Sequence, residues 1–289
     1  METIMIIGAG FMGAGIAQVC AQAGFRVYLV DNDDKALASS RKAVADSLQK
    51  FFARGQLAEH PPEVLQRIHC GASFEPVSRV QWIIESVTED ECLKRDLFME
   101  IDRRTERKIP LASNTSTIPI ERLAAGLRHP ERVLGLHFFG PVPMMGVVEV
   151  IRSRMTGDAV FEKGLTLVKS LGKRPLAVHR DIPGFILNRV FAAAFKEGLE
   201  LVASGTASIE DIDSGMRLGY GWGAGPFQIA DNAGIDTVLN VGKSMRALGE
   251  HHLVPDLAAL EKMVVDGKLG KKAGQGFYSY DDAGKKMEN

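Results

Sequence analysis

Residues 1–31 read METIMIIGAGFMGAGIAQVCAQAGFRVYLVD, and this stretch decides the fold. The apolar run 3–7 predicts a strand, residues 14–23 predict a helix and 26–30 predict a second strand. A glycine-spaced turn joins the first strand to the helix, and Asp31 follows the second strand. This order is typical of the βαβ unit with which α/β sheets bind dinucleotides.

The turn has the spacing Gly-x-Gly-x-x-Gly, and each glycine has a physical reason. Gly8 permits the tight turn, Gly10 lets the backbone approach a pyrophosphate, and Gly13 lets the helix pack closely on the strand. The start of the helix offers unpaired N–H groups and the positive end of the helix dipole to the phosphates. We therefore expect the cofactor to contact the whole segment: Gly8, Ala9, Gly10, Phe11, Met12 and Gly13.

The acidic residues after the second strand indicate which dinucleotide is bound. Asp31 is placed to accept hydrogen bonds from the hydroxyls of the adenosine ribose. Residues 31–34 read Asp-Asn-Asp-Asp, which would repel a 2′-phosphate and include no arginine to hold it. The expected cofactor is therefore NAD rather than NADP.

Composition limits the remaining possibilities. The 289 residues suit two domains, and 45% of them are hydrophobic, enough to bury a sizeable core. A net charge of −1 without a basic block favours neither a nucleic acid nor a membrane surface as partner. No run reaches transmembrane length, and no basic and apolar leader precedes the first strand. Three isolated cysteines without paired spacing indicate small buried side chains rather than a metal site, and fit a reducing cytoplasm.

The chain predicts two domains of different class. Strands alternate with helices over residues 1–182, which predicts an α/β domain with a Rossmann-type, doubly wound, mostly parallel sheet. Residues 183–289 have helical patterns and predict an all-helical domain. The segment 185–202 is apolar almost all round, so we expect it to be buried within this domain or against a second subunit. The expected strands after the βαβ unit are 82–86, 109–113, 133–138, 147–151 and 174–178.

A histidine and a glutamate stand on consecutive predicted strands. His137 closes one strand and Glu149 lies on the next, 12 positions later, across a loop rich in glycine and proline. Two neighbouring strands joined in this way can bring such positions side by side. A carboxylate beside an imidazole fixes its tautomer and stabilises its charged form, as a base that removes a proton from an alcohol requires. From the residues alone, a structural histidine remains an alternative.

Several segments in order resemble the 3-hydroxyacyl-CoA dehydrogenases, including bacterial 3-hydroxybutyryl-CoA dehydrogenases. The resemblance covers essentially the whole chain, and five ordered motifs are more specific than any one of them. They are GAGFMGAGIA at 8–17, SNTS at 113–116, GLHFF with PVP at 135–143, VEV at 148–150 and PGFILNR at 183–189; GPF at 225–227 and GQGFY at 274–278 continue the likeness.

The resemblance implies roles for four residues. His137 would be the catalytic base and Glu149 its orienting partner. Ser116 would contact the substrate oxygen and the cofactor, and Asn188 would polarise the 3-oxygen from the helical domain. From the residues alone, Ser116 is equally a helix cap and Asn188 equally a buried structural amide.

Further binding residues follow from the same resemblance. Glu89, Lys94 and Lys272 would contact the cofactor, although both lysines also read as solvated surface charges. Ser47 and Arg54 would contact the CoA nucleotide, with Arg54 keeping the positive charge of the family's usual lysine. The family usually has asparagine at Gly140, beside the cofactor, so this chain has lost a donor and gained space there.

The resemblance thus implies an NAD-dependent oxidation of (3S)-3-hydroxyacyl-CoA to 3-ketoacyl-CoA and the reverse reaction, with short acyl chains as the expected substrates. A homodimer through the C-terminal domain is expected. Two alternatives stay open: a dehydrogenase of a free hydroxy acid or sugar acid, which would not need Ser47 and Arg54, and a protein that binds the cofactor without catalysis.

Overall fold

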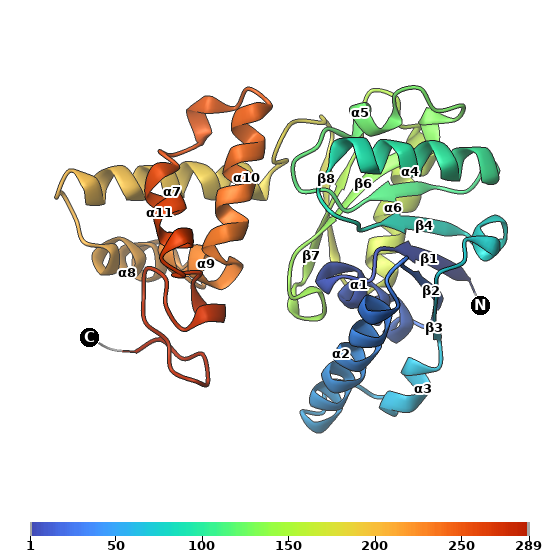
Figure 1. Ribbon diagram of the computed structural model, residues 1–289, viewed down its shortest axis with the longest axis horizontal. Coiled ribbons are helices and arrows are strands. Elements are labelled where there is room, and N and C mark those ends of the chain that lie inside the picture. The colour runs from blue at the N-terminus through green and yellow to red at the C-terminus, as the bar shows by residue number, and fades with distance from the viewer. Residues whose placement is uncertain (1, 288–289) are drawn as a thin grey trace. The chain divides into compact units, whose positions relative to one another are not determined.

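The computed structural model describes residues 2–287, and the chain divides into two compact units between Ile182 and Pro183. Figure 1 shows the first unit in blue to yellow-green and the second in yellow to red. Within the described residues, no helix is both long and apolar enough to cross a membrane.

The first unit is built on a single sheet of eight strands within residues 2–287, in the order β3-β2-β1-β4-β5-β6-β7-β8. Neighbouring strands are parallel except for the antiparallel pair β6 and β7. The strand order reverses at β1, because β2 and β3 lie on one side of it and β4 on the other. The strands are β1 Thr3–Ile7, β2 Arg26–Val30, β3 Ile68–Gly71, β4 Trp82–Glu85, β5 Leu111–Ser113, β6 Val133–Phe138, β7 Val147–Ile151 and β8 Arg174–Val178.

Helices cover both faces of this sheet (Figure 1). One core joins alternate residues of the strands, such as Ile4 and Ile6, to the apolar sides of α1, α2 and α6. The expected α/β domain with a mostly parallel sheet is confirmed, and its strands are apolar because both faces are buried. The helices are α1 Phe11–Gln22, α2 Asp34–Ala53, α3 Pro61–Leu65, α4 Glu91–Arg104, α5 Ile120–Ala124 and α6 Asp158–Ser170, with 3₁₀ turns η1 Glu75–Arg79, η2 Pro130–Arg132 and η3 Val142–Met144.

Two short elements were not expected from the sequence. β3 forms the edge of the sheet and pairs only with β2, so Ile68 alone of its four residues is fully buried. α5 begins after Pro119 and has five residues, too few to show a helical period. Both elements are short enough that their conformation depends on the neighbours that they pack against.

The second unit is all-helical in its described part apart from isolated bridges in the tail, as expected. Its core includes Phe195, Phe227 and Phe277, whose rings meet edge to face at centroid distances of 5.0–5.7 Å. Its helices are α7 Leu187–Ala203, α8 Ile209–Tyr220, α9 Pro226–Ala233, α10 Ile235–Ala247 and α11 Ala258–Val265, with 3₁₀ turns η4 His251–Leu253 and η5 Lys271–Ala273.

The apolar helix α7 is less buried than its sequence suggests. Within α7 only Phe195 and Gly198 are fully buried, whereas Val190 is 56% exposed. Burial within the domain is therefore incomplete: Phe191, Leu199 and Val202 are partly buried against its core, whereas Val190 is exposed in the single chain.

Candidate active site

The glycine turn after β1 has no room for side chains at two of its positions. Gly8 has a φ of +104°, and a Cβ there would lie 2.4 Å from the carbonyl oxygen of Ser86. A Cβ at Gly13 would lie 1.8 Å from the carbonyl oxygen of Gly8. By contrast, apart from Gly10 and its two chain neighbours, no described atom lies within 4 Å of the place that a Cβ at Gly10 would take, at the start of α1. The turn is thus closely packed at Gly8 and Gly13 and open at Gly10, as phosphate binding at a helix N-terminus requires.

Asp31 is fixed at the end of β2 beside this turn. Its Oδ2 accepts a hydrogen bond of 2.6 Å from the backbone N–H of Ala9, and its Oδ1 accepts one of 3.0 Å from Asp33. A carboxylate has about four acceptor positions, so these two bonds orient Asp31 and leave capacity for ribose hydroxyls. No lysine or arginine stands among residues 31–34. The free acceptor positions of Asp31, without a cation at residues 31–34 for a 2′-phosphate, fit NAD.

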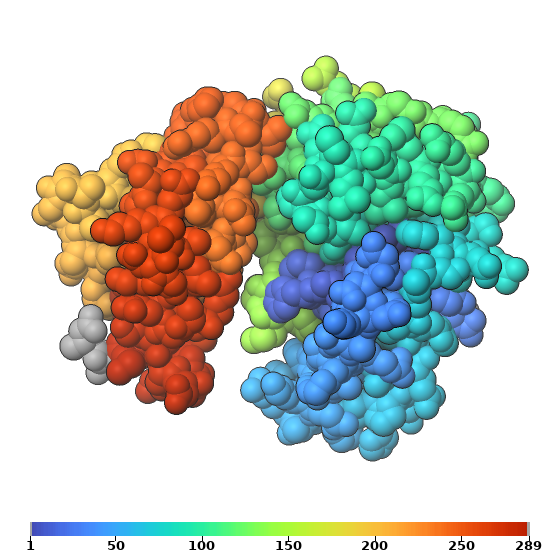
Figure 2. Space-filling view, viewed as in Figure 1, coloured from blue at the N-terminus to red at the C-terminus, as the bar shows by residue number. Residues whose placement is uncertain are grey.

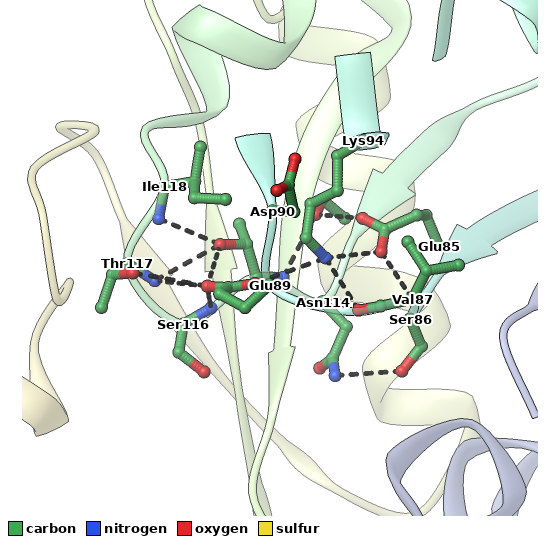
Figure 3. A network of polar contacts seen from close by, with 12 residues as sticks. Glu85, Ser86, Val87, Glu89, Asp90, Lys94, Asn114, Ser116, Thr117 and Ile118 are labelled. Carbon is green, nitrogen blue, oxygen red and sulfur yellow. Dashed lines mark hydrogen bonds and ion pairs between the residues drawn. The ribbon is translucent and has the colours of Figure 1, made fainter. Parts of the chain in front are cut away.

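A buried polar network links the ends of β4 and β5 (Figure 3). The carboxylate of Glu85 is fully buried; its Oε1 accepts hydrogen bonds from Val87 N–H (2.7 Å) and Lys94 Nζ (2.5 Å), and its Oε2 accepts one from Ser113 Oγ (2.6 Å). Burial raises the pKa of Glu85, and the bonds from Lys94 and Ser113 oppose that rise. The carboxylate of Glu85 therefore orders the start of the loop after β4 and the start of the loop after β5.

Two predicted cofactor residues belong to this network. Lys94 is only 1% exposed and pairs with Glu85 and, at 3.3 Å, with Glu89, so its alternative reading as a solvated surface charge is wrong. Glu89 Oε1 accepts hydrogen bonds from Thr115 Oγ1 (2.6 Å) and from the backbone N–H of Ser116 (2.9 Å); Figure 3 shows Glu89 beside Ser116. Glu89 thus holds the turn that carries Ser116. Contact of either residue with the cofactor remains a prediction.

His137 and Glu149 lie directly opposite each other on the antiparallel strands β6 and β7. His137 Nδ1 and Glu149 Oε2 are 2.7 Å apart, and the two residues are 3% and 0% exposed. In the neutral histidine, the carboxylate favours a proton on Nδ1, which makes Nε2 the basic nitrogen. The ring of Phe139 tilts against the imidazole at a centroid distance of 4.4 Å. The geometry matches that of a base with an orienting carboxylate.

Asn114 fixes the backbone next to this histidine. Its Oδ1 accepts a hydrogen bond of 2.9 Å from Phe138 N–H, and its Nδ2 donates to Ser86 Oγ at 3.4 Å. Three neighbouring strand ends are joined in this way by one amide. Neither Asn114 nor Glu85 was singled out in the sequence, although Glu85 ends the apolar strand β4 and Asn114 follows β5, and buried polar side chains at strand ends are a sign of a site.

Gly140 has a direct structural partner in Phe11. A Cβ at Gly140 would lie 2.7 Å from Phe11 Cε1 and 3.3 Å from Met12 Sδ. The ring of Phe11, 71% exposed, therefore occupies the space that an asparagine side chain at position 140 would enter. This chain thus combines glycine at position 140, where the family usually has asparagine, with a bulky aromatic residue at the start of α1.

The predicted CoA-binding residues lie on α2 and at its C-terminal end. Ser47 lines a groove of about 400 Å³ between α1, α2 and the loop that joins β6 to β7. Arg54 caps the C-terminus of α2 and is exposed. Seven residues separate the two, about two helical turns, so both lie on one side of the helix.

The remaining predicted residues belong to the second unit. Asn188 is the second residue of α7 and is half-buried, which contradicts its reading as a fully buried amide. Lys272 Nζ contacts both carboxylate oxygens of Asp236 at 2.6 Å, so its charge is already paired within its own unit. Both assignments stay predictions.

Comparison with known proteins assigns the chain. Residues 3–182 match the family model for the NAD-binding domain of 3-hydroxyacyl-CoA dehydrogenase, and residues 184–280 match the model for its C-terminal domain. The chain is 38% identical over 276 residues to a probable 3-hydroxybutyryl-CoA dehydrogenase of Deinococcus radiodurans, with 95% of the chain and 99% of that protein covered. It is 38% identical over 288 residues to human mitochondrial hydroxyacyl-coenzyme A dehydrogenase, with 97% and 91% covered.

A solved structure supports the same assignment. The crystal structure of (S)-3-hydroxybutyryl-CoA dehydrogenase PaaH1 from Ralstonia eutropha has a TM-score of 0.88 and 37% identity, with 98% of this chain and 100% of that chain covered. The doubly wound sheet, the glycine turn and the helical second unit define an NAD-binding oxidoreductase. Within that class, the chain belongs to the 3-hydroxyacyl-CoA dehydrogenase family.

Proposed function

We propose that this protein interconverts (3S)-3-hydroxyacyl-CoA and 3-ketoacyl-CoA with His137 as the general base. The observation that carries the proposal is the 2.7 Å contact between His137 Nδ1 and Glu149 Oε2 in a buried strand pair. Alcohol oxidation needs one group to take the hydroxyl proton while the hydride leaves the same carbon. Short acyl chains are the proposed substrates, because the names of two similar proteins specify 3-hydroxybutyryl-CoA.

The proposed reaction moves one proton, from the 3-hydroxyl of the substrate to the imidazole of His137. His137 Nε2 takes the proton of the 3-hydroxyl, the C3–O bond becomes a carbonyl, and the imidazole becomes an imidazolium. The Glu149 carboxylate stabilises that positive charge through Nδ1–H. NAD, when bound, supplies the acceptor for the hydride from C3. In the reverse direction, His137 returns the proton to the 3-oxygen.

Binding residues complete the proposal. Ser116, held by Glu89 through its backbone N–H, would contact the substrate oxygen and the cofactor. Asn188 would polarise the 3-oxygen. The Arg54 guanidinium, exposed at the end of α2, would contact a phosphate of CoA, and Ser47 would bind beside it.

The test is NADH consumption with acetoacetyl-CoA. We expect rapid turnover by the wild type and a loss of about a hundredfold or more in kcat for His137→Gln, the effect of removing a general base. His69→Gln makes the same chemical change at an exposed residue of β3 and should keep full activity. Turnover by His137→Gln within a factor of two of wild type would reject the assigned base.

The class of substrate needs a separate measurement. If the enzyme recognises CoA itself, free CoA should compete with acetoacetyl-CoA, and Arg54→Met should weaken that competition. A dehydrogenase of free hydroxy acids or sugar acids would be insensitive to free CoA, and that result would favour the alternative substrate class.

We also propose a homodimer through the C-terminal domain. Large apolar side chains of α7 and α8 are exposed in the single chain: Val190 by 56%, Leu218 by 83% and Tyr220 by 80%. Such a surface is typical of a contact between proteins. Sedimentation should give a dimer at micromolar concentration, and Leu218→Glu should shift it towards monomer; a wild-type monomer would overturn this proposal.

A further inference from the structure

The groove between α1 and α2 has walls made almost entirely of small or apolar residues. Figure 2 shows the blue surface of these helices and, beside it, the yellow-green loop between β6 and β7. The loop packs tightly on α1, since a Cβ at Gly15 would lie 2.8 Å from Val142 Cβ. Lining residues from the three segments are Ala9, Gly10, Phe11, Ala14, Gly15 and Gln18; Ala36, Ser39, Ser40, Ala43, Val44 and Ser47; and Pro141, Val142 and Pro143.

The polar character of this groove is confined to a few uncharged groups. Among the described residues that line it, none carries a charge, so it offers no counterion to a phosphate. Its polar side chains are one glutamine and three serines, and Ser40 Oγ already donates to the carbonyl oxygen of Ala9. The groove therefore suits a slender, neutral ligand with hydrogen-bonding groups spaced along an apolar chain.

Gln18 is the one buried polar side chain of the groove whose hydrogen bonding is incomplete within residues 2–287. It is 2% exposed, and its Nε2 has no hydrogen-bond partner there. Burying an amide without a partner is costly, so such a group calls for a ligand or a water. A half-turn about the last side-chain bond exchanges the oxygen and the nitrogen without changing the shape of the amide, so Gln18 can present a donor or an acceptor.

The charges next to the groove indicate how a ligand would lie in it. Ser47 lines the groove, and the exposed Lys50 and Arg54 follow on α2 within two helical turns, about 10 Å. Phosphates would meet these cations outside the groove, and the neutral remainder of the same molecule would lie inside. The arm that links the nucleotide of an acyl-CoA to its thioester has this chemistry, because it is uncharged and carries two amides.

We propose that Gln18 is a substrate-recognition residue, which hydrogen-bonds an amide of the CoA arm in the groove between α1 and α2. This inference rests on the proposed acyl-CoA substrate and adds the residue that reads the arm. Gln18 acts on binding of the arm and takes no part in proton or hydride transfer. Its removal should therefore change recognition of the arm and leave the chemistry at His137 unaltered.

The test compares Gln18→Met with wild type on two substrates. Acetoacetyl-CoA carries the arm, whereas S-ethyl acetothioacetate has the same reacting group without any amide. With acetoacetyl-CoA we expect KM to rise about three- to tenfold, the effect of one lost hydrogen bond, at unchanged kcat and unchanged KM for NADH. With the short thioester we expect kcat/KM to be equal for the two proteins.

Gln22→Met is the matched control. It makes the same change one helical turn farther along α1, at a residue that does not line the groove, and should leave all constants unchanged. Gln18→Met should fold normally, because methionine has a similar shape and replaces a buried amide whose nitrogen has no partner within residues 2–287. Its midpoint of thermal unfolding should equal or exceed that of wild type.

The other possible results distinguish failure of this inference from failure of the proposed function. An unchanged KM for acetoacetyl-CoA in Gln18→Met would mean that the Gln18 side chain hydrogen-bonds water and not the CoA arm. This result would overturn the inference while the proposed function stands. An equal loss on both substrates would mean a structural role, and would overturn it as well. Absence of acetoacetyl-CoA turnover in the wild type would instead reject the proposed function, on which the inference depends.

Discussion

Glu149 Oε2 lies 2.7 Å from His137 Nδ1 because the two residues are register partners on β6 and β7. The contact is held by backbone pairing on both sides of it, so the orientation of the imidazole does not depend on a mobile loop. Glu149→Gln keeps the shape but removes the charge that would stabilise the imidazolium. We expect kcat for acetoacetyl-CoA reduction to fall about a hundredfold, with KM for NADH little changed.

An undiminished kcat in Glu149→Gln would contradict the orienting role of Glu149.

The buried pair of Glu85 and Lys94 should couple strongly in stability. Lys94→Met leaves the Glu85 carboxylate buried without its cation, and we expect the free energy of unfolding to fall by about 3–5 kcal/mol. Glu85→Gln with Lys94→Met removes both charges and should recover much of that loss. Urea denaturation of the wild type, both single variants and the double variant gives the coupling energy. Additive losses would show that the two side chains do not depend on each other.

Asp102 should contribute to stability in a pH-dependent way. Burial alone would raise the pKa of Asp102, but the Arg128 backbone N–H at 2.6 Å and the Arg132 guanidinium at 2.9 Å hold it below its usual value. Stability from this group is therefore present above pH 3.8, the usual pKa, and is lost as pH falls through the lowered value. Asp102→Asn should lower stability at pH 7 and lessen its decline in acid. The measurement is the free energy of unfolding of the wild type and of Asp102→Asn between about pH 2 and 7. Parallel pH curves for the two proteins would contradict this role of Asp102.

Lys173 should set the position of the loop between β6 and β7. It is 9% exposed, and its Nζ donates to the carbonyl oxygens of Val142 (2.8 Å) and Met145 (2.5 Å). Lys173→Met leaves the buried carbonyl of Val142 and the partly buried carbonyl of Met145 without this donor, so we expect a loss of about 2 kcal/mol in unfolding free energy. KM for acetoacetyl-CoA should also rise, because Val142 lines the groove. Lys173→Arg, which restores donors, should recover KM in part; full activity of Lys173→Met would exclude the positioning role.

Gly140 and Phe11 should behave as a coupled pair. Gly140→Asn would bring a side chain against the Phe11 ring, since a Cβ there is already 2.7 Å from Cε1. We expect Gly140→Asn to raise KM for NADH several-fold, and the added change Phe11→Leu to relieve most of that rise. A double-mutant cycle on KM measures the coupling. Independent effects of the two substitutions would mean that the ring simply swings into solvent.

Much of the fold could be read from the sequence because its signals are local. The spacing of Gly8, Gly10 and Gly13 reports backbone requirements that the neighbouring strand and helix impose, and apolar runs report strands covered on both faces. The pairing of His137 with Glu149 was also predictable, since a short loop between adjacent strands fixes the register. The short elements β3 and α5 escaped, because neither is long enough to show a period.

The tertiary structure alone decided which charges and amides have partners. Lys94 and Lys272 look alike in sequence as exposed cations, yet one is buried against Glu85 and the other is paired with Asp236, 36 positions away. Asn114 and Gln18 differ in the same way: one amide joins three strand ends, and the other lines a groove and has a buried nitrogen without a partner among residues 2–287. Sequence determines local backbone preference and the polarity of each residue. The cost of a buried polar group depends on neighbours that only the folded chain brings together.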